Sequence, residues 1–312
     1  MADLSFMPLM IERICRDAVG EPAQHMERMT FGHCNVVYEV KTADRELIVR
    51  TNEDPAVLRG TEANLAVLLD LGLPVPKVLH ADLSAAEYPF AYLVLPKIPG
   101  CDLRYALPGM TGAQMTALAG QIVSFQRIVG QLPQGSGFGW VPIGEKGPFR
   151  SWADVIERDL NKHFDQAARS LTEAEIGTLT EQAESFRGYF GQVEPRCFLD
   201  DITIKNVIMQ DGELQGMIDF DSVCYGDPLY MAALTQTAVV SDVPGKDAIF
   251  YIEELCRLWG MDGRQRAIVD FYSCVHGLSF LSFYGSDPGQ AEYRDRVVAF
   301  MKERLSAGRA KY

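Results

Sequence analysis

The chain has 312 residues and a formal net charge of −13, with 47% hydrophobic and 23% charged residues. This composition is typical of a globular protein long enough for two domains with cores of their own, and it excludes a disordered or low-complexity chain. The negative charge disfavours nucleic-acid binding. Seven scattered cysteines without a CxxC pair argue against a disulfide framework or a zinc site, and they fit a reducing cytoplasm.

Neither a signal peptide nor a membrane span is expected. The apolar stretch near the start is short, lacks a basic head and is followed by Glu12 and Arg13. The longest uncharged run, residues 105–126, is interrupted by glycines, a proline and glutamines. Residues 1–150 carry 13 basic and 16 acidic side chains, and residues 151–312 carry 16 and 26. An acidic second half would attract a cationic small molecule, and it would serve solubility equally well.

The first part of the chain predicts a small α+β domain. Its pattern indicates a helix over residues 8–18, strands near 25–40 and 46–51, and a helix over 55–71 closed by Gly72. The turn at residues 30–35, between two strands, is a weak candidate for a phosphate-covering loop, and an ordinary hairpin explains it equally well.

One carboxylate of the helix over 55–71 falls on an otherwise apolar stripe. Leu58, Glu62 and Leu65 share that stripe at helical spacing. A carboxylate on an apolar face requires a cationic partner or a proton. We therefore expect Glu62 to form an ion pair, although it would face solvent if it lies at the edge of the stripe.

The second part of the chain is predicted to be mainly helical. A strand AYLVL leads into Pro96-Lys97-Ile98-Pro99-Gly100, a short stiff linker between a first domain of residues 1–98 and a second of residues 99–312. Periodic apolar patterns then predict a series of helices, near residues 111–132, 151–167, 172–191, 228–240, 247–259, 262–284 and 289–306.

Residues 197–231 contain the most informative pattern. A strand NVIM, a tight turn at Asp211-Gly212 and a returning strand ELQGMI predict a hairpin. Because a hairpin brings its two ends together, Asn206 and Asp219 are expected to be neighbours, with Asp201 one short loop away. Magnesium takes few protein ligands, typically carboxylates plus a carbonyl, and leaves its other positions to water and phosphates. The pattern therefore predicts a magnesium and phosphoryl-transfer site.

This segment resembles the catalytic core of the aminoglycoside phosphotransferase and choline kinase family, which are small-molecule kinases. Family members typically contain His-Gly-Asp-Leu-x-x-x-Asn, then Ile-Asp-Phe or Ile-Asp-Trp, then Gly-Asp-Pro-x-x-Asp. The corresponding stretches here run from Leu199 to Asn206, from Ile218 to Phe220, and from Gly226 to Met231. The resemblance covers most of residues 30–235. It implies an α+β, two-lobed, protein-kinase-like fold with a small sheet-containing N-terminal lobe and a mainly helical C-terminal lobe.

The resemblance also implies the reaction and its central residues. ATP and Mg²⁺ would be the cofactors, and the γ-phosphoryl group would pass to a hydroxyl of a small molecule such as an amino sugar or amino alcohol. Asp201 would orient that hydroxyl and take its proton, while Asn206 and Asp219 would hold Mg²⁺. The choice between ATP and GTP and the oligomeric state stay open.

Further nucleotide contacts are implied in the first domain. Arg50, held by an ion pair with Glu62, would neutralise the α and β phosphates. At the linker, the carbonyl of Pro96 would accept a hydrogen bond from adenine, and the amide of Ile98 would donate one.

Two family positions differ in this chain. The family His corresponds to Leu199 and the last family Asp to Met231, so a hydrogen-bonded pair becomes an apolar pair. We expect these two side chains to pack together and to hold the catalytic loop by burial instead of by hydrogen bonding. The change also leaves an alternative open, a nucleotide-binding regulator that has lost catalysis.

Three charged residues near the motif have simpler explanations. Asp200 and Asp221 are expected to be solvated or loop-ordering carboxylates. Lys205 would either contact the transferred phosphate or be solvated, and solvation is slightly favoured.

Overall fold

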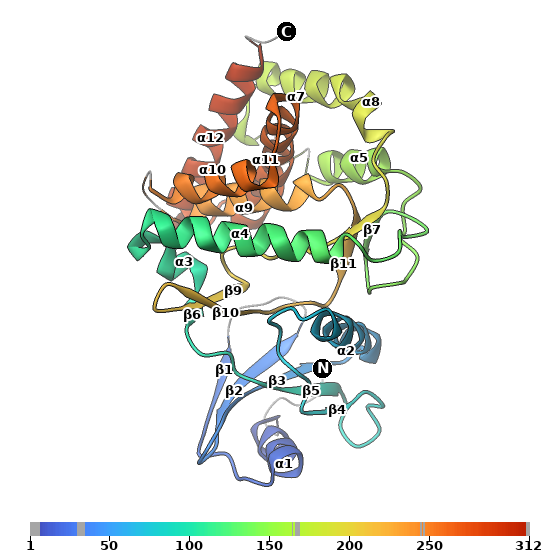
Figure 1. The fold of residues 1–312 in the computed structure, drawn as a ribbon, viewed down its shortest axis with the longest axis vertical. Coiled ribbons are helices and arrows are strands. Elements are labelled where there is room, and N and C mark those ends of the chain that lie inside the picture. Colours follow the sequence, from blue (N-terminus) through green and yellow to red (C-terminus); the bar gives the residue numbers. More distant parts are fainter. Residues whose placement is uncertain are drawn as a thin grey trace. The chain divides into compact units, whose positions relative to one another are not determined.

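The protein consists of two compact units in the computed structural model, which describes residues 7–29, 35–163, 165, 169–243, 245 and 247–309. The first unit extends to Gly100 and also includes Gln215–Ser222; the second contains Cys101–Leu214 and the chain from Val223 onward (Figure 1). The division expected from the sequence placed residues 215–222 with the helical part. The structure groups this segment with the first unit, where the amide of Met217 donates to the carbonyl of Pro74 at 2.8 Å.

The first unit is built on a five-stranded sheet of order β1-β2-β3-β5-β4. All neighbouring strands that contact one another in this sheet are antiparallel. The strands are β1 (His25–Met29), β2 (Val36–Lys41), β3 (Glu46–Asn52), β4 (His80–Asp82) and β5 (Ala91–Pro96). The two strands expected within residues 25–40 are β1 and β2.

Alternating side chains of the sheet face two different helices. Tyr92 and Val94 of β5 belong to the core cluster that includes the buried face of α1 (Met7–Val19), whereas Ala91 and Leu93 pack with Leu58 of α2 (Pro55–Asp70). This alternation follows from the two-residue period of a strand. Arg50 of β3 lies opposite Leu93 in the register, so it is on the α2 side of the sheet.

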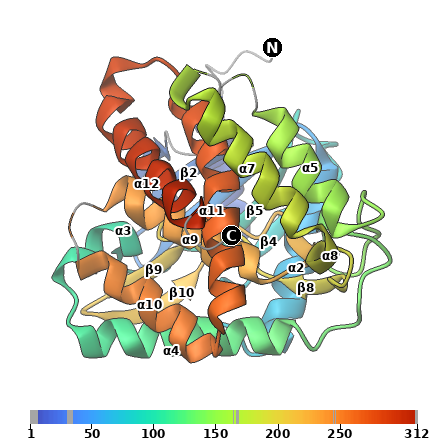
Figure 2. The ribbon, with the colours of Figure 1, turned by 90° about the horizontal axis from the view of Figure 1, so that it is seen from above.

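The second unit is mainly helical, and its helices bury a common core. Helix α9 packs against α10 and α11, α4 lies along α10, and α12 packs against α11 (Figure 2). The helices are α3 (Leu103–Ala106), α4 (Gly112–Val129), α5 (Trp152–Lys162), α7 (Glu173–Ser185), α8 (Arg187–Phe190), α9 (Leu229–Asp242), α10 (Asp247–Trp259), α11 (Gly263–Tyr284) and α12 (Ala291–Arg309). Short 3-10 turns lie at Leu107–Gly109 and Pro288–Gln290.

Two small sheets carry the loops of interest. One has the order β10-β9-β6, with β6 (Cys101–Asp102), β9 (Val207–Gln210) and β10 (Glu213–Met217). The other has the order β7-β11-β8, with β7 (Gly139–Val141), β8 (Arg196–Phe198) and β11 (Val223–Gly226). Strand β8 ends directly before Leu199, so the loop that carries Asp201 begins at the edge of a sheet.

The predicted α+β class is confirmed, with one helix divided. The helix expected over residues 172–191 ends at Ser185 and resumes at Arg187. The hydroxyl of Ser185 donates to the carbonyl of Gln182, and the ring of Phe186 packs against Phe271. Among the described residues, no helix combines the length and apolar character needed to cross a bilayer.

Candidate active site

The hairpin β9–β10 leads into Asp219, which lies just beyond its second strand. Asp211 and Gly212 form the connecting turn with φ angles of 53° and 80°, as the Asp-Gly pair predicts. Asp219, two residues beyond β10, also has a left-handed backbone, with φ of 71°. Non-glycine residues in this conformation are uncommon and cluster at functional sites. Asp219 therefore stands out by backbone geometry as well as by motif.

Arg50 binds the two carboxylates that flank Phe220. Its Nη2 lies 3.0 Å from Oδ1 of Asp219 and 2.9 Å from Oδ1 of Asp221. The Arg50 side chain is only 10% exposed. Its Nε is buried and has no hydrogen-bond partner among the described residues, so the guanidinium retains a donor that suits an anionic oxygen.

Asp221 is the best-connected carboxylate of this cluster. Its Oδ1 also accepts a hydrogen bond of 2.6 Å from the hydroxyl of Thr61, and its Oδ2 accepts one of 2.8 Å from Nδ2 of Asn35. The carbonyl of Phe220 accepts a further bond from the buried amide of Asn64. Side chains of α2 thus fix the segment that carries Asp219.

The prediction of an ion pair between Arg50 and Glu62 is wrong. Within the described residues, Arg50 pairs with Asp219 and Asp221, and no ion pair joins it to Glu62. The buried face of α2 contains Leu58, Thr61 and Leu65, and Glu62 is only half-buried beside it. Because Thr61 and not Glu62 faces inward, the helix reaches the arginine through Asp221. Of the turn at residues 30–35, a weak candidate for covering phosphates, only Asn35 belongs to the described residues.

In the second unit, hydrogen bonds join the residues of the loop that carries Asp201. Thr203 donates to Oδ1 of Asp201 at 3.1 Å, and Nδ2 of Asn206 donates to the carbonyl of Asp201 at 2.8 Å. The amide of Asn206 bonds back to the carbonyl of Thr203. Asn206 is 8% exposed. With its Nδ2 engaged by the loop, its Oδ1 is the atom that suits a metal ion.

The start of this loop is held by two side chains that the sequence did not single out. Gln126 of α4 binds Leu199 twice, donating from Nε2 to its carbonyl at 2.6 Å and accepting from its amide at 3.0 Å. Trp140 of β7 donates from Nε1 to Asp200. Hydrogen bonds thus hold the backbone of Leu199, whereas the expected apolar replacement concerned its side chain.

Leu199 and Met231 are both buried, at 2% and 0% exposure. Their mutual contact stays a prediction. Lys205 is not simply solvated, since its Nζ lies 2.9 Å from Asp242, whose side chain is 3% exposed. The ion pair directs this lysine to the end of α9.

The Gly-Asp-Pro motif has a structural role in the second unit. Asp227 is buried and accepts hydrogen bonds from the hydroxyls of Tyr189 and Tyr272 and from the amide of Leu229. Burial raises the pKa of Asp227. Its three donors offset part of the cost of burying the carboxylate, so Asp227 ties three segments of the helical unit together.

The linker residues lie at the end of the first sheet. Pro96 closes β5 opposite Leu47, and the amide of Lys97 donates to the carbonyl of Glu46. Ile98 packs against Gly216, where a Cβ atom would come within 2.6 Å of its Cδ1. The expected contacts of Pro96 and Ile98 with adenine stay predictions.

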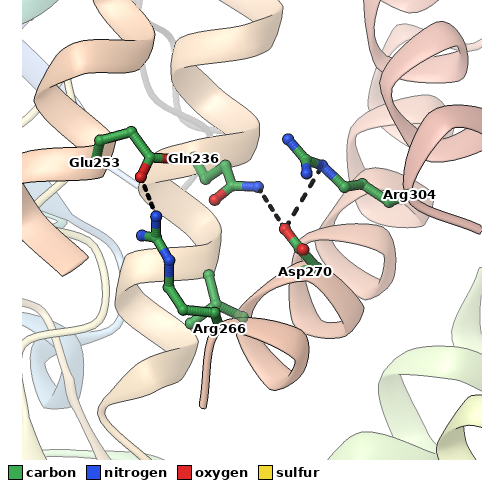
Figure 3. A pocket seen from close by; sticks show the side chains of 6 residues that line it. Gln236, Glu253, Arg266, Asp270 and Arg304 are labelled. Carbon is green, nitrogen blue, oxygen red and sulfur yellow. Dashed lines mark hydrogen bonds and ion pairs between the residues drawn. The ribbon is translucent and has the colours of Figure 1, made fainter. Parts of the chain in front are cut away.

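A separate cavity of about 110 Å³ lies among α9, α10, α11 and α12 (Figure 3). Glu253 and Arg266 pair with each other, and Asp270 contacts both Gln236 and Arg304. The charges that line the cavity are therefore balanced internally, and no excess charge remains to select a ligand.

Comparison with known proteins gives one family and a group of related folds. A sequence model of the family described as "Phosphotransferase enzyme family" matches residues 26–266. No curated protein matches the chain in sequence.

Solved structures of aminoglycoside phosphotransferases have a similar fold. The crystal structure of aminoglycoside phosphotransferase APH(4)-Ia has a TM-score of 0.68 at 16% identity, covering 96% of this chain and 99% of that one. A thermostable mutant of the same protein, in a ternary complex with AMP-PNP and hygromycin B, has a TM-score of 0.66 at 17% identity and covers 96% and 98%. The GDP and kanamycin complex of APH(2″)-IIIa has a TM-score of 0.69 at 15% identity and covers 96% and 99%. At these identities the likeness establishes the protein-kinase-like fold.

Proposed function

Because the chain belongs to the phosphotransferase enzyme family, we propose that it transfers the γ-phosphoryl group of ATP to a hydroxyl group of a small molecule. The observation that carries this proposal is the arrangement around Asp219. This carboxylate follows the hairpin in a left-handed conformation, 3.0 Å from a largely buried arginine with an unused donor. A carboxylate beside a guanidinium suits a nucleotide phosphate with its metal ion, because the carboxylate can bind the metal and the guanidinium the phosphate.

ATP and Mg²⁺ fit the side chains that are present. The unpartnered Nε of Arg50 suits a phosphate oxygen, and Asp219 and Asn206 offer the hard oxygen atoms that Mg²⁺ prefers. When bound, these groups supply the phosphoryl group and neutralise its charge. At the linker, we assign the carbonyl of Pro96 and the amide of Ile98 to adenine recognition.

The protein's own part in the reaction is positioning and proton transfer. Asp201 accepts the proton of the acceptor hydroxyl while the hydroxyl oxygen forms the new bond to the γ-phosphorus. The bond between the γ-phosphorus and the bridging oxygen breaks, and ADP leaves with its electron pair. Thr203 orients the carboxylate of Asp201 by its hydrogen bond. Arg50 balances the negative charge of the α and β phosphates, and Asp221 keeps the guanidinium in place. Glu62 has no direct part in this scheme.

The acceptor is proposed to be a small molecule with a hydroxyl group, such as an amino sugar or amino alcohol. The two complexes described above contain hygromycin B and kanamycin, which support an acceptor of this size for the fold. The excess of acidic residues in the second half of the sequence favours a cationic acceptor. The free cysteines favour a reducing, cytoplasmic setting for the reaction.

The test is a screen of amino sugars, amino alcohols, sugars and nucleosides with labelled ATP and Mg²⁺, in which transfer is read directly. We expect transfer by the wild type, and a loss of at least about 100-fold in Asp201→Asn with nucleotide-induced thermal stabilisation preserved. Equal rates of the two proteins would contradict the role of Asp201. Stabilisation by ATP and Mg²⁺ without transfer to any acceptor would instead favour the nucleotide-binding regulator.

A further inference from the structure

The backbone of Leu199 leads directly from β8 into the loop that carries Asp201. Strand β8 ends at Phe198, and Asp201 lies two residues beyond Leu199. At 2% exposure, the amide and carbonyl of Leu199 are removed from water and require partners. One side chain supplies both.

That side chain is Gln126, which acts on Leu199 as a neighbouring strand would. Its Nε2 donates to the Leu199 carbonyl at 2.6 Å and its Oε1 accepts from the Leu199 amide at 3.0 Å. Gln126 is itself 4% exposed and lies in the last two turns of α4, a long helix with a complete capping box at Thr111. A primary amide presents a donor and an acceptor side by side, so it can satisfy both backbone groups at once.

We propose that Gln126 is a positioning residue, which fixes the backbone of Leu199 and thereby the placement of Asp201 in the reaction. This inference rests on the proposed phosphotransfer function and adds a residue to it. Leu199 cannot hydrogen-bond through its side chain, as the histidine of related motifs would. The amide of Gln126 braces the backbone of the loop from a different element.

Other contacts hold the part of the loop that follows Asp201. Ile204 accepts a bond from the amide of Arg104, and Lys205 pairs with Asp242, so both of these anchors follow Asp201 in sequence. Before Asp201, the backbone is held at Leu199, and Trp140 binds only the side chain of Asp200. Loss of Gln126 would leave the buried amide and carbonyl of Leu199, two residues before Asp201, without the two hydrogen bonds that this side chain supplies.

The experiment compares Gln126→Met with a matched control, Gln236→Met. Gln236 is 7% exposed, belongs to the same unit and donates a hydrogen bond to Asp270, but it lies in the internally balanced cavity of Figure 3. For protein shown to be folded by near-UV circular dichroism, we expect kcat to fall by about 100-fold in Gln126→Met. The KM for ATP should change less than twofold, and Gln236→Met should keep kcat within about twofold of wild type.

A second variant covers the case in which Gln126→Met does not fold. In Gln126→Glu, the protonated carboxyl can still donate to the Leu199 carbonyl and accept from its amide, whereas the carboxylate repels that carbonyl. The ratio of kcat between Gln126→Glu and wild type should therefore rise as the pH falls. A ratio that does not change with pH, or an undiminished kcat in folded Gln126→Met, would overturn the proposal, as would equal losses in Gln126→Met and Gln236→Met.

Hydrogen exchange separates failure of this inference from failure of the proposed function. In a peptide covering residues 197–206, Gln126→Met should exchange faster than wild type, while Gln236→Met should not. If wild type transfers phosphate to no acceptor, the function proposal fails, and faster exchange in Gln126→Met alone still supports the loop anchor. Unchanged exchange in that variant refutes the anchor whatever the activity.

Discussion

Arg50 illustrates how a buried cation selects its partners. Its side chain is 10% exposed, and the carboxylates of Asp219 and Asp221 both lie within hydrogen-bonding distance. Asp221 has further donors in Thr61 and Asn35, whereas Asp219 is 47% exposed. We infer a division of labour, in which Asp221 compensates the buried charge and Asp219 keeps an exposed oxygen for a metal ion.

A pair of variants tests this division. Asp221→Asn should lower the free energy of unfolding by about 3 kcal/mol, because it leaves a largely buried arginine with less compensation. Glu62→Gln should change it by no more than about 0.5 kcal/mol, since Glu62 is half-buried and forms no ion pair with Arg50 in the described structure. Urea unfolding measures both, and a similar loss in the two variants would restore Glu62 as the partner.

His276 makes the stability of the folded protein depend on pH. It is 8% exposed, its Nε2 lies 3.1 Å from the carbonyl of Tyr230, and burial lowers its pKa to about 3. An unfolded histidine has its ordinary pKa near 6.5. As the pH falls from 6.5 towards 3, the unfolded chain therefore binds a proton that the folded chain does not, and stability decreases.

The expected effect is a loss of about 2 kcal/mol between pH 7 and pH 5 that is absent in His276→Gln, which keeps a donor for the Tyr230 carbonyl but does not titrate. The measurement is the free energy of unfolding in urea at both pH values. Because other groups titrate equally in both proteins, the difference between them isolates His276. Parallel pH dependence in wild type and variant would show that this histidine is protonated when folded.

At the scale of elements, the hairpin β9–β10 depends on its turn. Asp211 and Gly212 both have positive φ, and a Cβ atom at Gly212 would also meet the side chain of Gln114, part of the cap of α4. Gly177 differs in every respect, because it lies exposed within helix α7 with open space where a Cβ would be. The two glycines form a natural comparison.

Gly212→Ala should destabilise the protein by about 1 to 2 kcal/mol, because alanine is strained in the left-handed conformation. Gly177→Ala should stabilise it by about 0.5 to 1 kcal/mol, because the exposed helix loses a flexible residue. Thermal unfolding of both variants gives the opposite signs directly. Destabilisation by both would mean that α7 is held in a way that its exposed glycine does not reveal.

Elements with a strong local pattern were predictable, and those without one were not. The Asp211-Gly212 hairpin and long helices such as α4 and α11 follow from turn chemistry and apolar periodicity. Strands β6, β7 and β8 have two or three residues each, too few to show a period. In the candidate site, Asp201, Asn206 and Asp219 come from a motif, but the Gln126–Leu199 contact joins residues 73 positions apart with no local sign.

The choice of Glu62 over Thr61 shows a different limit. Leu58, Glu62 and Leu65 and the observed buried set Leu58, Thr61 and Leu65 both obey helical spacing. Hydrophobicity alone favours neither, because position 61 and position 62 are both polar. Only the fold, which brings Asp221 to α2, decides that the hydroxyl faces inward.

For the whole molecule, charge is the property most directly linked to the proposed reaction. Residues 151–312 carry 26 acidic and 16 basic side chains, an imbalance much larger than that of residues 1–150. Such a field attracts cations over distances that salt shortens. The proposed acceptor class should therefore respond to ionic strength.

We expect kcat/KM for a cationic acceptor to fall severalfold from low to physiological ionic strength, because screening weakens its attraction to the acidic protein. A neutral hydroxyl acceptor found in the same screen should change less than twofold. Steady-state kinetics with both acceptors, at constant free Mg²⁺ and ATP, makes the comparison. Equal salt dependence would assign the acidity to solubility alone.

The short excursion of Gln215–Ser222 into the first unit has a consequence for recombination among relatives. A chimaera that exchanges only the portion before Cys101 would combine an arginine from one parent with acidic counter-ions from another. Residues 215–222 must be exchanged together with that portion if the guanidinium of Arg50 is to keep its native carboxylate partners. We therefore expect positions in contact to change together during evolution. A substitution at Arg50 should be accompanied by a compensating substitution at Asp221, although more than a hundred and sixty positions separate the two in sequence.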